Sequence, residues 1–420
     1  MFMKILKIIV VLIVLLAIAL GVYWFFVQKN NGTGDTMFSN LSVGDIFPFG
    51  QGTVDAPVTT PTPIVTNPND TNPTGIPVIP PSLWQISTQP QSGAIAFNAS
   101  GTPTVRYIDK ATGNAFESAL RLVGTNRITN TTIPKVYEAL WQPQGSAVIL
   151  RFLIDDNETI RSAFGKLVTT SATSTTEESS TLKELSVSFL ADNITNLSVD
   201  PATGAVAYVS KNPAGAKVYV TTSTVSSPKQ IFESEIRDIS VSWVNSSTLA
   251  LSTKPSESTP GQFYFLNTTS GKLERVIGEL NGLTALSNSN GTDLVYSWVT
   301  GNSTNSALYN TKTGQQTSLR TALIPEKCVF AKKSSNLFCA NPKSTPSKIL
   351  AEDWYKGKIS FNDSFWKINT TTGAIELMND PKIVAGTEID AINLMLDPNE
   401  EHLIFTNKKD SHLWALKVGN

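Results

Sequence analysis

Histidine and cysteine are scarce in this 420-residue sequence, which contains two residues of each. The two histidines, His402 and His412, are too few to build a metal centre, and no nucleophile motif stands beside them. The sequence also lacks a Gly-x-Ser-x-Gly motif, which excludes a hydrolase domain of the type that carries its serine on that turn. We therefore expect no catalytic residue, no cofactor and no metal site.

Charge is also sparse, since charged residues make up 16% of the chain and the net charge is −1. No long basic run occurs, and a nucleic-acid-binding surface needs clustered Lys and Arg. A nucleic-acid partner is therefore not expected. Leu-rich helical blocks are absent after residue 30, whereas Ser, Thr, Asn, Gly and Pro are plentiful, and this composition favours strands and turns.

One long apolar run, Ile5 to Val27, stands at the N-terminus and is long enough to cross a bilayer, which takes roughly 20 helical residues. Lys4 and Lys7 precede most of it, which by the positive-inside rule places the N-terminus in the cytoplasm and the remaining chain outside. Residues 1–29 are thus predicted to be a retained single-pass anchor in the cell membrane. A cleaved signal peptide is the alternative, although its apolar core usually spans about 7–15 residues.

Residues 30–82 form a segment rich in Pro, Thr and Asn, with nine prolines from Pro48 to Pro81. Such a composition cannot bury enough apolar surface to fold alone. Pro-rich chains extend by about 3.1 Å per residue. We predict a disordered stalk between the anchor and a folded domain.

Beyond residue 82 a two-part unit recurs. Its first part is a strand, a turn and an apolar strand, as in Leu140 to Leu150 and in Leu197 to Tyr208. Its second part is a strand ending in Asn or Asp, a Thr-Gly or Ser-Gly turn and another strand, as in Tyr107 to Gly113 and in Tyr309 to Gly314. Each unit supplies four strands in roughly 40 to 50 residues, which is the blade period of β-propellers.

Seven units fit into residues 83–420, which predicts an all-β, seven-bladed β-propeller of four-stranded antiparallel blades. The innermost strands are expected to begin near Gly93, Lys135, Ile194, Asp238, Gly282, Lys327 and Asp390. The last unit holds only three strands, and Leu83 to Ser87 is available as its fourth, which would close the ring. A two-sheet sandwich is the alternative fold, because strand spacing alone also permits it.

The stretch from Leu394 to Trp414 resembles the repeat of TolB-like and WD-like propellers, in which a Ser-Pro-Asp-Gly type of turn joins the two inner strands. This chain has Asp397-Pro398-Asn399-Glu400 at that turn. The resemblance covers residues 83–420 as a pattern and implies a propeller of this superfamily, which the predicted anchor would make a membrane-anchored, extracytoplasmic member. It implies no particular activity, because such propellers host many.

Cys328 and Cys339 flank a hairpin that would turn at Lys333-Ser334 and would place the two residues opposite each other. Cross-strand Cβ atoms at such a position can be bridged, and disulfides persist outside the cytoplasm. We predict a disulfide within blade six. Two unlinked buried thiols are the alternative.

A long insertion, Asn341 to Phe361, interrupts blade six between its second and third strands. It carries Asp353, Trp354 and Tyr355, and aromatic and acidic residues in a long loop are typical of a binding surface. We predict that these three residues contact a ligand on the face away from the entry of Leu83. In the alternative interpretation, Trp354 and Tyr355 fold back and cap blade six.

These features predict a binding or scaffolding module at the cell surface that recognises an unknown protein or glycan. An extracytoplasmic polysaccharide-active enzyme is the alternative, with carboxylates from separate blades meeting in the propeller channel. A third hypothesis is a stalked domain that only organises an envelope complex.

Overall fold

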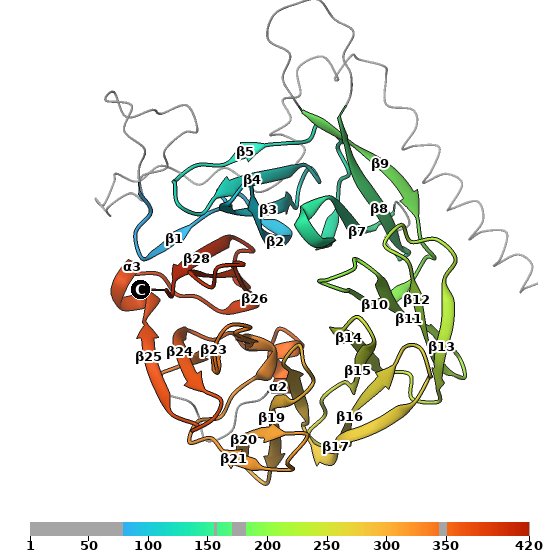
Figure 1. Ribbon diagram of the computed structural model, residues 1–420, viewed down its shortest axis with the longest axis vertical. Helices are drawn as coiled ribbons and strands as arrows, with labels where there is room; N and C mark the ends of the chain where they lie inside the picture. Colours follow the sequence, from blue (N-terminus) through green and yellow to red (C-terminus); the bar gives the residue numbers. More distant parts are fainter. Residues whose placement is uncertain (1–78, 155–157, 170–181, 344–350, 420) are drawn as a thin grey trace, which may run out of the picture. The chain divides into compact units, whose positions relative to one another are not determined.

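Each predicted repeat folds into one four-stranded antiparallel sheet, and seven such sheets surround a central axis (Figure 1). The computed structural model describes residues 79–154, 158–169, 182–343 and 351–419. All of them belong to one compact unit, Val65–Asn420. The prediction of a seven-bladed β-propeller is confirmed, and the two-sheet sandwich is excluded.

The first four blades follow one another along the chain. From the innermost strand outward, blade one contains β2 (Gln91–Ala99), β3 (Thr102–Asp109), β4 (Ala115–Ala119) and β5 (Asn126–Arg127). Blade two contains β6 (Val136–Trp141), β7 (Ala147–Leu153), β8 (Ile160–Thr169) and β9 (Lys183–Phe189). Blade three contains β10 (Ile194–Val199), β11 (Val206–Asn212), β12 (Gly215–Thr221) and β13 (Lys229–Ser234). Blade four contains β14 (Ile239–Asn245), β15 (Thr248–Thr253), β16 (Pro260–Asn267) and β17 (Leu273–Asn281).

The last three blades continue the pattern. Blade five contains β18 (Thr284–Ser287), β19 (Asp293–Thr300), β20 (Ser303–Asn310) and β21 (Gln316–Ser318). Blade six contains β22 (Cys328–Phe330), β23 (Asn336–Pro342), β24 (Asp363–Asn369) and β25 (Ile375–Asn379). Blade seven contains β26 (Ala391–Leu396), β27 (His402–Asn407), β28 (Leu413–Lys417) and β1 (Leu83–Gln85). The short helical elements are η2 (Pro143–Gly145), η3 (Pro325–Lys327), α2 (Ala351–Tyr355) and α3 (Pro381–Ala385).

The innermost strands begin within two residues of their predicted positions. This accuracy depends on the turns, because an Asp or Asn side chain closes a Thr-Gly or Ser-Gly turn in the same way in blades one, four, five and six. Asp109 Oδ1 accepts hydrogen bonds from the Thr112 amide (2.8 Å) and hydroxyl (2.6 Å). Gly113 follows with a φ of +73°, a left-handed conformation that glycine adopts without a steric penalty. The second and third strands of blade one are therefore joined by a turn encoded in five consecutive residues.

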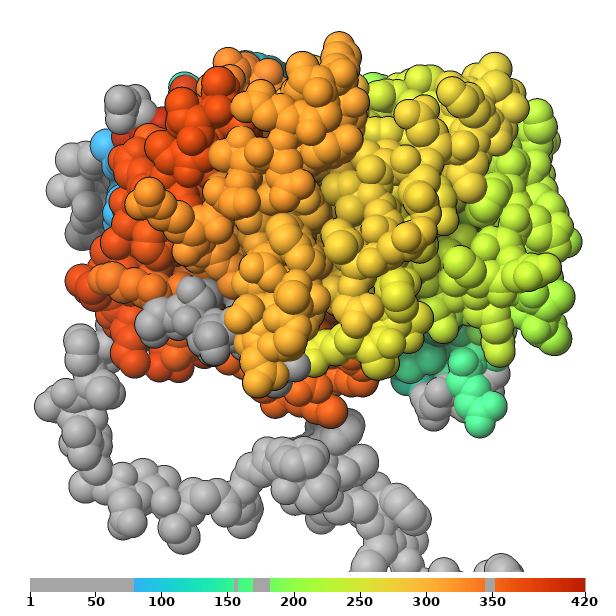
Figure 2. All heavy atoms as spheres, turned by 90° about the horizontal axis from the view of Figure 1, so that it is seen from below, coloured from blue at the N-terminus to red at the C-terminus, as the bar shows by residue number. Residues whose placement is uncertain are grey.

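The core is divided among the seven seams between neighbouring blades. One cluster of buried apolar side chains fills each seam, and the blades pack directly against one another along the outer wall (Figure 2). A separate eighth cluster joins Trp354 of α2 to Ile324 and Phe361. The insertion in blade six therefore has a small core of its own.

β1 closes the ring as the outermost strand of blade seven. It runs antiparallel to β28, with Leu83 opposite Leu416. The contact continues past β1, since the Ile86 amide donates a hydrogen bond to the Leu413 carbonyl (2.7 Å). The predicted closure through Leu83 to Ser87 is confirmed, and β28 has no unpaired edge.

The predicted disulfide is also present. Cys328 on β22 lies directly opposite Cys339 on β23, and their sulfurs are bonded (S–S 2.07 Å). Both residues are buried in the seam between blades five and six. The bridge therefore links the two innermost strands of blade six.

Strand direction divides the propeller into two faces. Because strands alternate, the connections between second and third strands share a face with the connections between blades, and we call this the insertion face. The other hairpin turns, and the start of β1, lie on the opposite face, which we call the turn face. α2 lies on the insertion face, as its place between β23 and β24 requires.

The predicted anchor and residues 30–78 of the predicted stalk lie outside the described residues. Within the part of the chain that the structure describes, no helix has both the length and the apolar character to cross a membrane.

Candidate functional site

α2 lies near the inner ends of the blades and is tied to two blades besides its own (Figure 1). The Glu257 backbone N–H, in the β15–β16 loop of blade four, donates to Glu352 Oε2 (3.2 Å). Lys408, in the β27–β28 loop of blade seven, donates its Nζ to the Trp354 carbonyl. α2 therefore connects loops of blades four, six and seven on the insertion face.

Local interactions shape α2 but do not suffice to hold it. Glu352 pairs with Lys356 and Asp353 with Lys358, all on the surface, and such exposed pairs contribute little. The helix ends at Tyr355, and beyond it the Gly357 N–H donates to the Trp354 carbonyl (3.1 Å). A helix of five residues is unstable by itself, so tertiary contacts fix it.

Trp354 supplies the main tertiary contact. Its side chain is buried, at 4% exposure, and its ring stacks on Phe361 with 6.4 Å between the centroids. The indole N–H lies 3.0 Å from both carboxylate oxygens of Asp390. The Lys408 ammonium lies 4.1 Å from the centroid of the same ring. Trp354 thus anchors α2 through apolar packing, a hydrogen bond and a cation–π contact.

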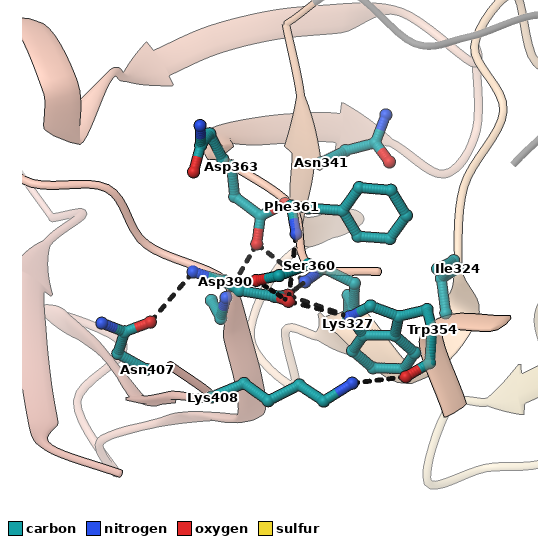
Figure 3. Close-up of polar contacts among 12 residues, drawn as sticks. Ile324, Lys327, Asn341, Trp354, Ser360, Phe361, Asp363, Asp390, Asn407 and Lys408 are labelled. Carbon is teal, nitrogen blue, oxygen red and sulfur yellow. Dashed lines mark hydrogen bonds and ion pairs between the residues drawn. The ribbon is translucent and has the colours of Figure 1, made fainter. Parts of the chain in front are cut away.

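A buried ionic cluster lies beneath Trp354 (Figure 3). Lys327 Nζ is 2.7 Å from Asp363 Oδ2 and also contacts Asp390 Oδ1. All three side chains are at most 1% exposed. One ammonium is therefore shared by two carboxylates away from water.

Strand ends bring the three charged residues together. Lys327 is the last residue of η3 and directly precedes β22, Asp363 begins β24, and Asp390 directly precedes β26. Lys327 and Asp390 thus hold equivalent places in blades six and seven. We call Lys327, Asp363 and Asp390 the buried triad; it crosses the seam between these two blades.

Backbone and side-chain donors complete the triad. Asp390 Oδ2 accepts hydrogen bonds from the Ser360 hydroxyl (3.0 Å) and the Phe361 amide (3.1 Å). Asp363 Oδ2 accepts one from the Ala391 amide (2.7 Å). Ser360 and Phe361 belong to the insertion, so Asp390 binds α2 through Trp354 and also the residues at the C-terminal end of the insertion.

Burial affects the two carboxyls differently. It raises the pKa of Asp363 to about 6, although Lys327 acts in the opposite direction. Burial also opposes ionisation of Asp390, but Lys327 and the hydrogen bonds from Phe361 and Trp354 outweigh it and lower the pKa of Asp390. Asp390 therefore stays ionised beside Lys327, and Asp363 is the first of the two carboxylates to be protonated as the pH falls.

The raised pKa of Asp363 predicts a pH dependence of folding stability. The pKa of Asp363 is about 6 in the folded protein, above the usual 3.8. The stability that the protonated Asp363 carboxyl contributes is therefore fully present below a pH of about 3.8. It is lost as the pH rises through the folded pKa. We expect the wild-type protein to lose about 2–3 kcal/mol relative to Asp363→Asn between about pH 4 and about pH 7. Urea unfolding at a series of pH values measures this difference.

A matched control for this experiment removes one carboxylate from the surface, as in Glu376→Gln. Glu376 pairs with Lys367 at 2.7 Å, and both side chains reach solvent. This variant should keep the wild-type slope of stability against pH. A slope for Asp363→Asn that equals the wild-type slope would contradict the assignment of the proton to Asp363.

Tyr355 lies beside Trp354 and points toward a different residue. Its ring is 39% exposed, and its hydroxyl hydrogen-bonds the carboxylate of Glu326 in η3. Both side chains reach solvent, yet the surrounding protein limits their hydration and raises the pKa of Glu326 and of Tyr355. Tyr355 therefore presents an aromatic ring at a fixed place on the insertion face.

The three residues predicted to bind a ligand are thus in different environments. Asp353 is half-buried and pairs with Lys358 (3.1 Å), while Tyr355 is exposed. For Trp354 the alternative interpretation, in which the side chain folds back and caps blade six, applies. Its ring is buried in the eighth cluster and cannot contact a partner. The binding role of Asp353 and Tyr355 stays a prediction.

Sequence reasoning used Lys327 and Asp390 only as markers of strand starts and did not propose the buried triad. A signal was present, since a charged residue stands between apolar residues at the same position of two consecutive repeats, in Ile324 to Val329 and in Ile389 to Ile392. Asp363 gave no such signal. Its position became evident only with the register of β24.

A cavity of about 330 Å³ lies next to the triad on the insertion face. Its lining includes the carboxylates of Asp363, Asp380 and Glu388 and the amines of Lys343 and Lys382. Lys382 and Glu388 pair at 3.0 Å, so much of this charge is neutralised locally. Within the described part of the chain, Asp363 Oδ1 has no hydrogen-bond partner. The cavity is polar, and water can satisfy this oxygen.

No protein-family model and no curated protein sequence matches this chain. Solved structures do match. The β-propeller domain of the Trilobed protease from Pyrococcus furiosus aligns with 78% of this chain and 96% of its own, at 8% identity and a TM-score of 0.50. The tricorn protease aligns with 81% of this chain and 34% of its own, at 8% identity and a TM-score of 0.50.

TolB from Acinetobacter baumannii is a further match, at 9% identity and a TM-score of 0.41, and it covers 76% of this chain and 66% of its own. At such low identities the likeness concerns the fold alone. The class of protein is therefore a seven-bladed β-propeller, and its function has to be argued from its own surfaces.

Proposed function

We propose that this protein is a membrane-anchored, extracytoplasmic binding module that takes a protein or glycan partner on the insertion face of its propeller. One observation carries the proposal. α2 is held by blades four, six and seven while Asp353 and Tyr355 of the same helix remain accessible.

The energetics of the buried triad support this proposal. Burying three charged side chains costs desolvation energy, and apolar residues of similar size often stabilise a fold equally well. The triad therefore does little for net stability and instead fixes the position of the insertion, because Asp390 binds Trp354, Ser360 and Phe361. A surface that is already ordered loses less entropy when a partner binds.

The types of residue on and near α2 also support the insertion face as the binding surface. Tyr is enriched at protein interfaces because it combines a large apolar ring with a polar hydroxyl. Around Tyr355 lie the charged side chains of Glu352, Asp353, Lys356 and Lys358, which form a polar rim. An aromatic centre with a polar rim is the usual anatomy of a binding patch.

Photo-crosslinking tests the proposal. A photo-reactive amino acid replaces Tyr355 in the full-length protein in its native cells, and the matched control replaces Lys312 in an exposed turn on the opposite face. A discrete adduct from position 355 that is missing from position 312 supports a protein partner. For a glycan partner, Tyr355→Ala should reduce co-sedimentation with isolated envelope polysaccharide, whereas Lys312→Ala should not.

Two results would contradict the proposal. One is equal labelling from both positions. The other is a Tyr355→Ala variant that captures the crosslinked protein and co-sediments with envelope polysaccharide as the wild type does. Tyr355→Ala suits this test better than a Trp354 variant, because loss of the buried Trp354 ring would disturb the fold.

The anchored location is part of this proposal and makes a separate prediction. If Ile5 to Val27 is retained as a signal anchor, the protein in the membrane fraction keeps its original N-terminus, because no peptidase removes the apolar run. Mass spectrometry of the N-terminal peptide measures this. A mature N-terminus beyond Gly21 would show that the segment is a cleaved signal peptide.

A further inference from the structure

A second group of ionisable residues lies on the turn face, far from α2 in the topology. Asp397, Glu401 and His402 surround the turn between β26 and β27. One oxygen or nitrogen atom of each lies within 4.8 Å of the others. Asp397 is 1% exposed and His402 is 6% exposed, whereas Glu401 is half-buried. The group sits at the seam between blades seven and one, where β1 closes the ring.

The backbone of the turn holds the Asp397 carboxylate in place. Its Oδ1 accepts hydrogen bonds from the amides of Glu401 (2.8 Å) and His402 (2.6 Å), and its Oδ2 accepts one from Asn399 (3.2 Å). Asp397 therefore offers a carboxylate in a fixed orientation.

His402 provides the second, independent observation. Its Nδ1 is buried and has no hydrogen-bond partner among the described residues, because Asp397 Oδ1, at 3.7 Å, is beyond hydrogen-bond distance. Trp84 of β1 packs edge-on against the imidazole ring, with 5.7 Å between the centroids. Buried ring nitrogens nearly always have a partner. The ring is thus held with an unused nitrogen beside a carboxylate.

We propose that Asp397, Glu401 and His402 bind one divalent transition-metal ion, Zn²⁺ or Mn²⁺. One imidazole and two carboxylates suit these ions, whereas Mg²⁺ and Ca²⁺ prefer oxygen ligands alone. This assignment departs from the expectation, based on the small number of histidines, that the chain has no metal site.

Glu401 gives the ion access to the site. Its carboxylate is partly exposed and pairs with Arg121 of blade one at 3.3 Å. Such an exposed pair contributes little, so the carboxylate can leave Arg121 at low cost. The bound ion would then fix the β26–β27 turn and the imidazole of His402, which packs on Trp84 of β1.

Calorimetric titration of the full-length protein tests this inference. The protein is solubilised in detergent, treated with EDTA and titrated with ZnCl₂, MnCl₂ and MgCl₂ separately. We expect one saturable site per chain for Zn²⁺ or Mn²⁺ and no comparable site for Mg²⁺. At about 100 times Kd the ion should raise the melting temperature by about 3 °C, and EDTA should reverse this.

Two variants and one control locate the site. His402→Asn and Glu401→Gln should each weaken binding by at least about tenfold. Glu401→Gln changes a surface group and keeps the test valid if the buried substitution unfolds the protein. The control, His412→Asn, removes the other histidine, which lies 3.5 Å from Asp410, and should bind as the wild type does. Absence of saturable Zn²⁺ and Mn²⁺ binding, or wild-type affinity in Glu401→Gln, would overturn the inference.

Discussion

Replacing Lys327 by Met is expected to lower the free energy of unfolding by about 3–5 kcal/mol at neutral pH, because two buried carboxylates lose their shared cation. Met is close to Lys in length and fills the same space. Met supplies no cation in place of the ammonium, and all three side chains of the triad are at most 1% exposed. Urea unfolding followed by Trp fluorescence measures the change.

The matched control is Lys343→Met, which removes an ammonium from the surface near the same blade. The Lys343 side chain is 56% exposed and lies 3.7 Å from Asp380. Its loss should change stability by no more than about 0.5 kcal/mol. The double variant Lys327→Met with Asp363→Asn should regain part of the lost stability, because it removes one of the two unpaired charges. Wild-type stability of Lys327→Met would show that the carboxyls do not depend on this cation.

The fold could be predicted from the sequence because its determinants are local. The turn from Asp109 to Gly113 is closed by the Asp109 side chain, and related turns recur in other blades. Cys328 and Cys339 pair within one hairpin, so their spacing alone places them opposite each other. Ring closure followed from a count of strands, since the seventh repeat holds three strands and one further strand, Leu83 to Ser87, precedes the first repeat.

The candidate site could not be predicted in the same way. Lys327 and Asp390 are 63 residues apart and meet only because consecutive blades repeat the same geometry. Trp354 stands in an insertion without strand periodicity, so nothing in the sequence distinguishes a buried ring from an exposed one. Its burial depends on Asp390, which satisfies the indole N–H from another blade. Long-range partners of this kind are set by the assembled ring.

His402 illustrates the same limit on the turn face. The sequence places it at the start of a strand, where a histidine is usually an ordinary packed or solvated residue. Its unused Nδ1 becomes evident only when the turn brings Asp397 to 3.7 Å and β1 brings Trp84 against the ring. Trp84 lies 318 residues before His402 in the sequence.

Deletion of Ser82 to Thr88 is expected to abolish the cooperative thermal unfolding of the propeller. The deletion removes Leu83, Trp84 and Ile86, which are 4%, 8% and 5% exposed. Loss of one buried aromatic ring alone costs about 3–5 kcal/mol, against a total stability of about 5–15 kcal/mol for a typical domain. It also leaves β28 as an unpaired edge that can recruit a second chain. Calorimetry and size-exclusion chromatography detect the lost transition and the aggregates.

Two further variants separate the causes of this effect. Deletion of residues 61–67, within the predicted stalk, shortens the chain by the same seven residues and should leave the transition unchanged. Trp84→Ala keeps the pairing of β1 with β28 and removes only the ring, so it should lower stability by about 3–5 kcal/mol while unfolding stays cooperative. An unchanged transition after deletion of Ser82 to Thr88 would mean that the ring does not depend on β1. In that case blade seven would have to be stable without β1.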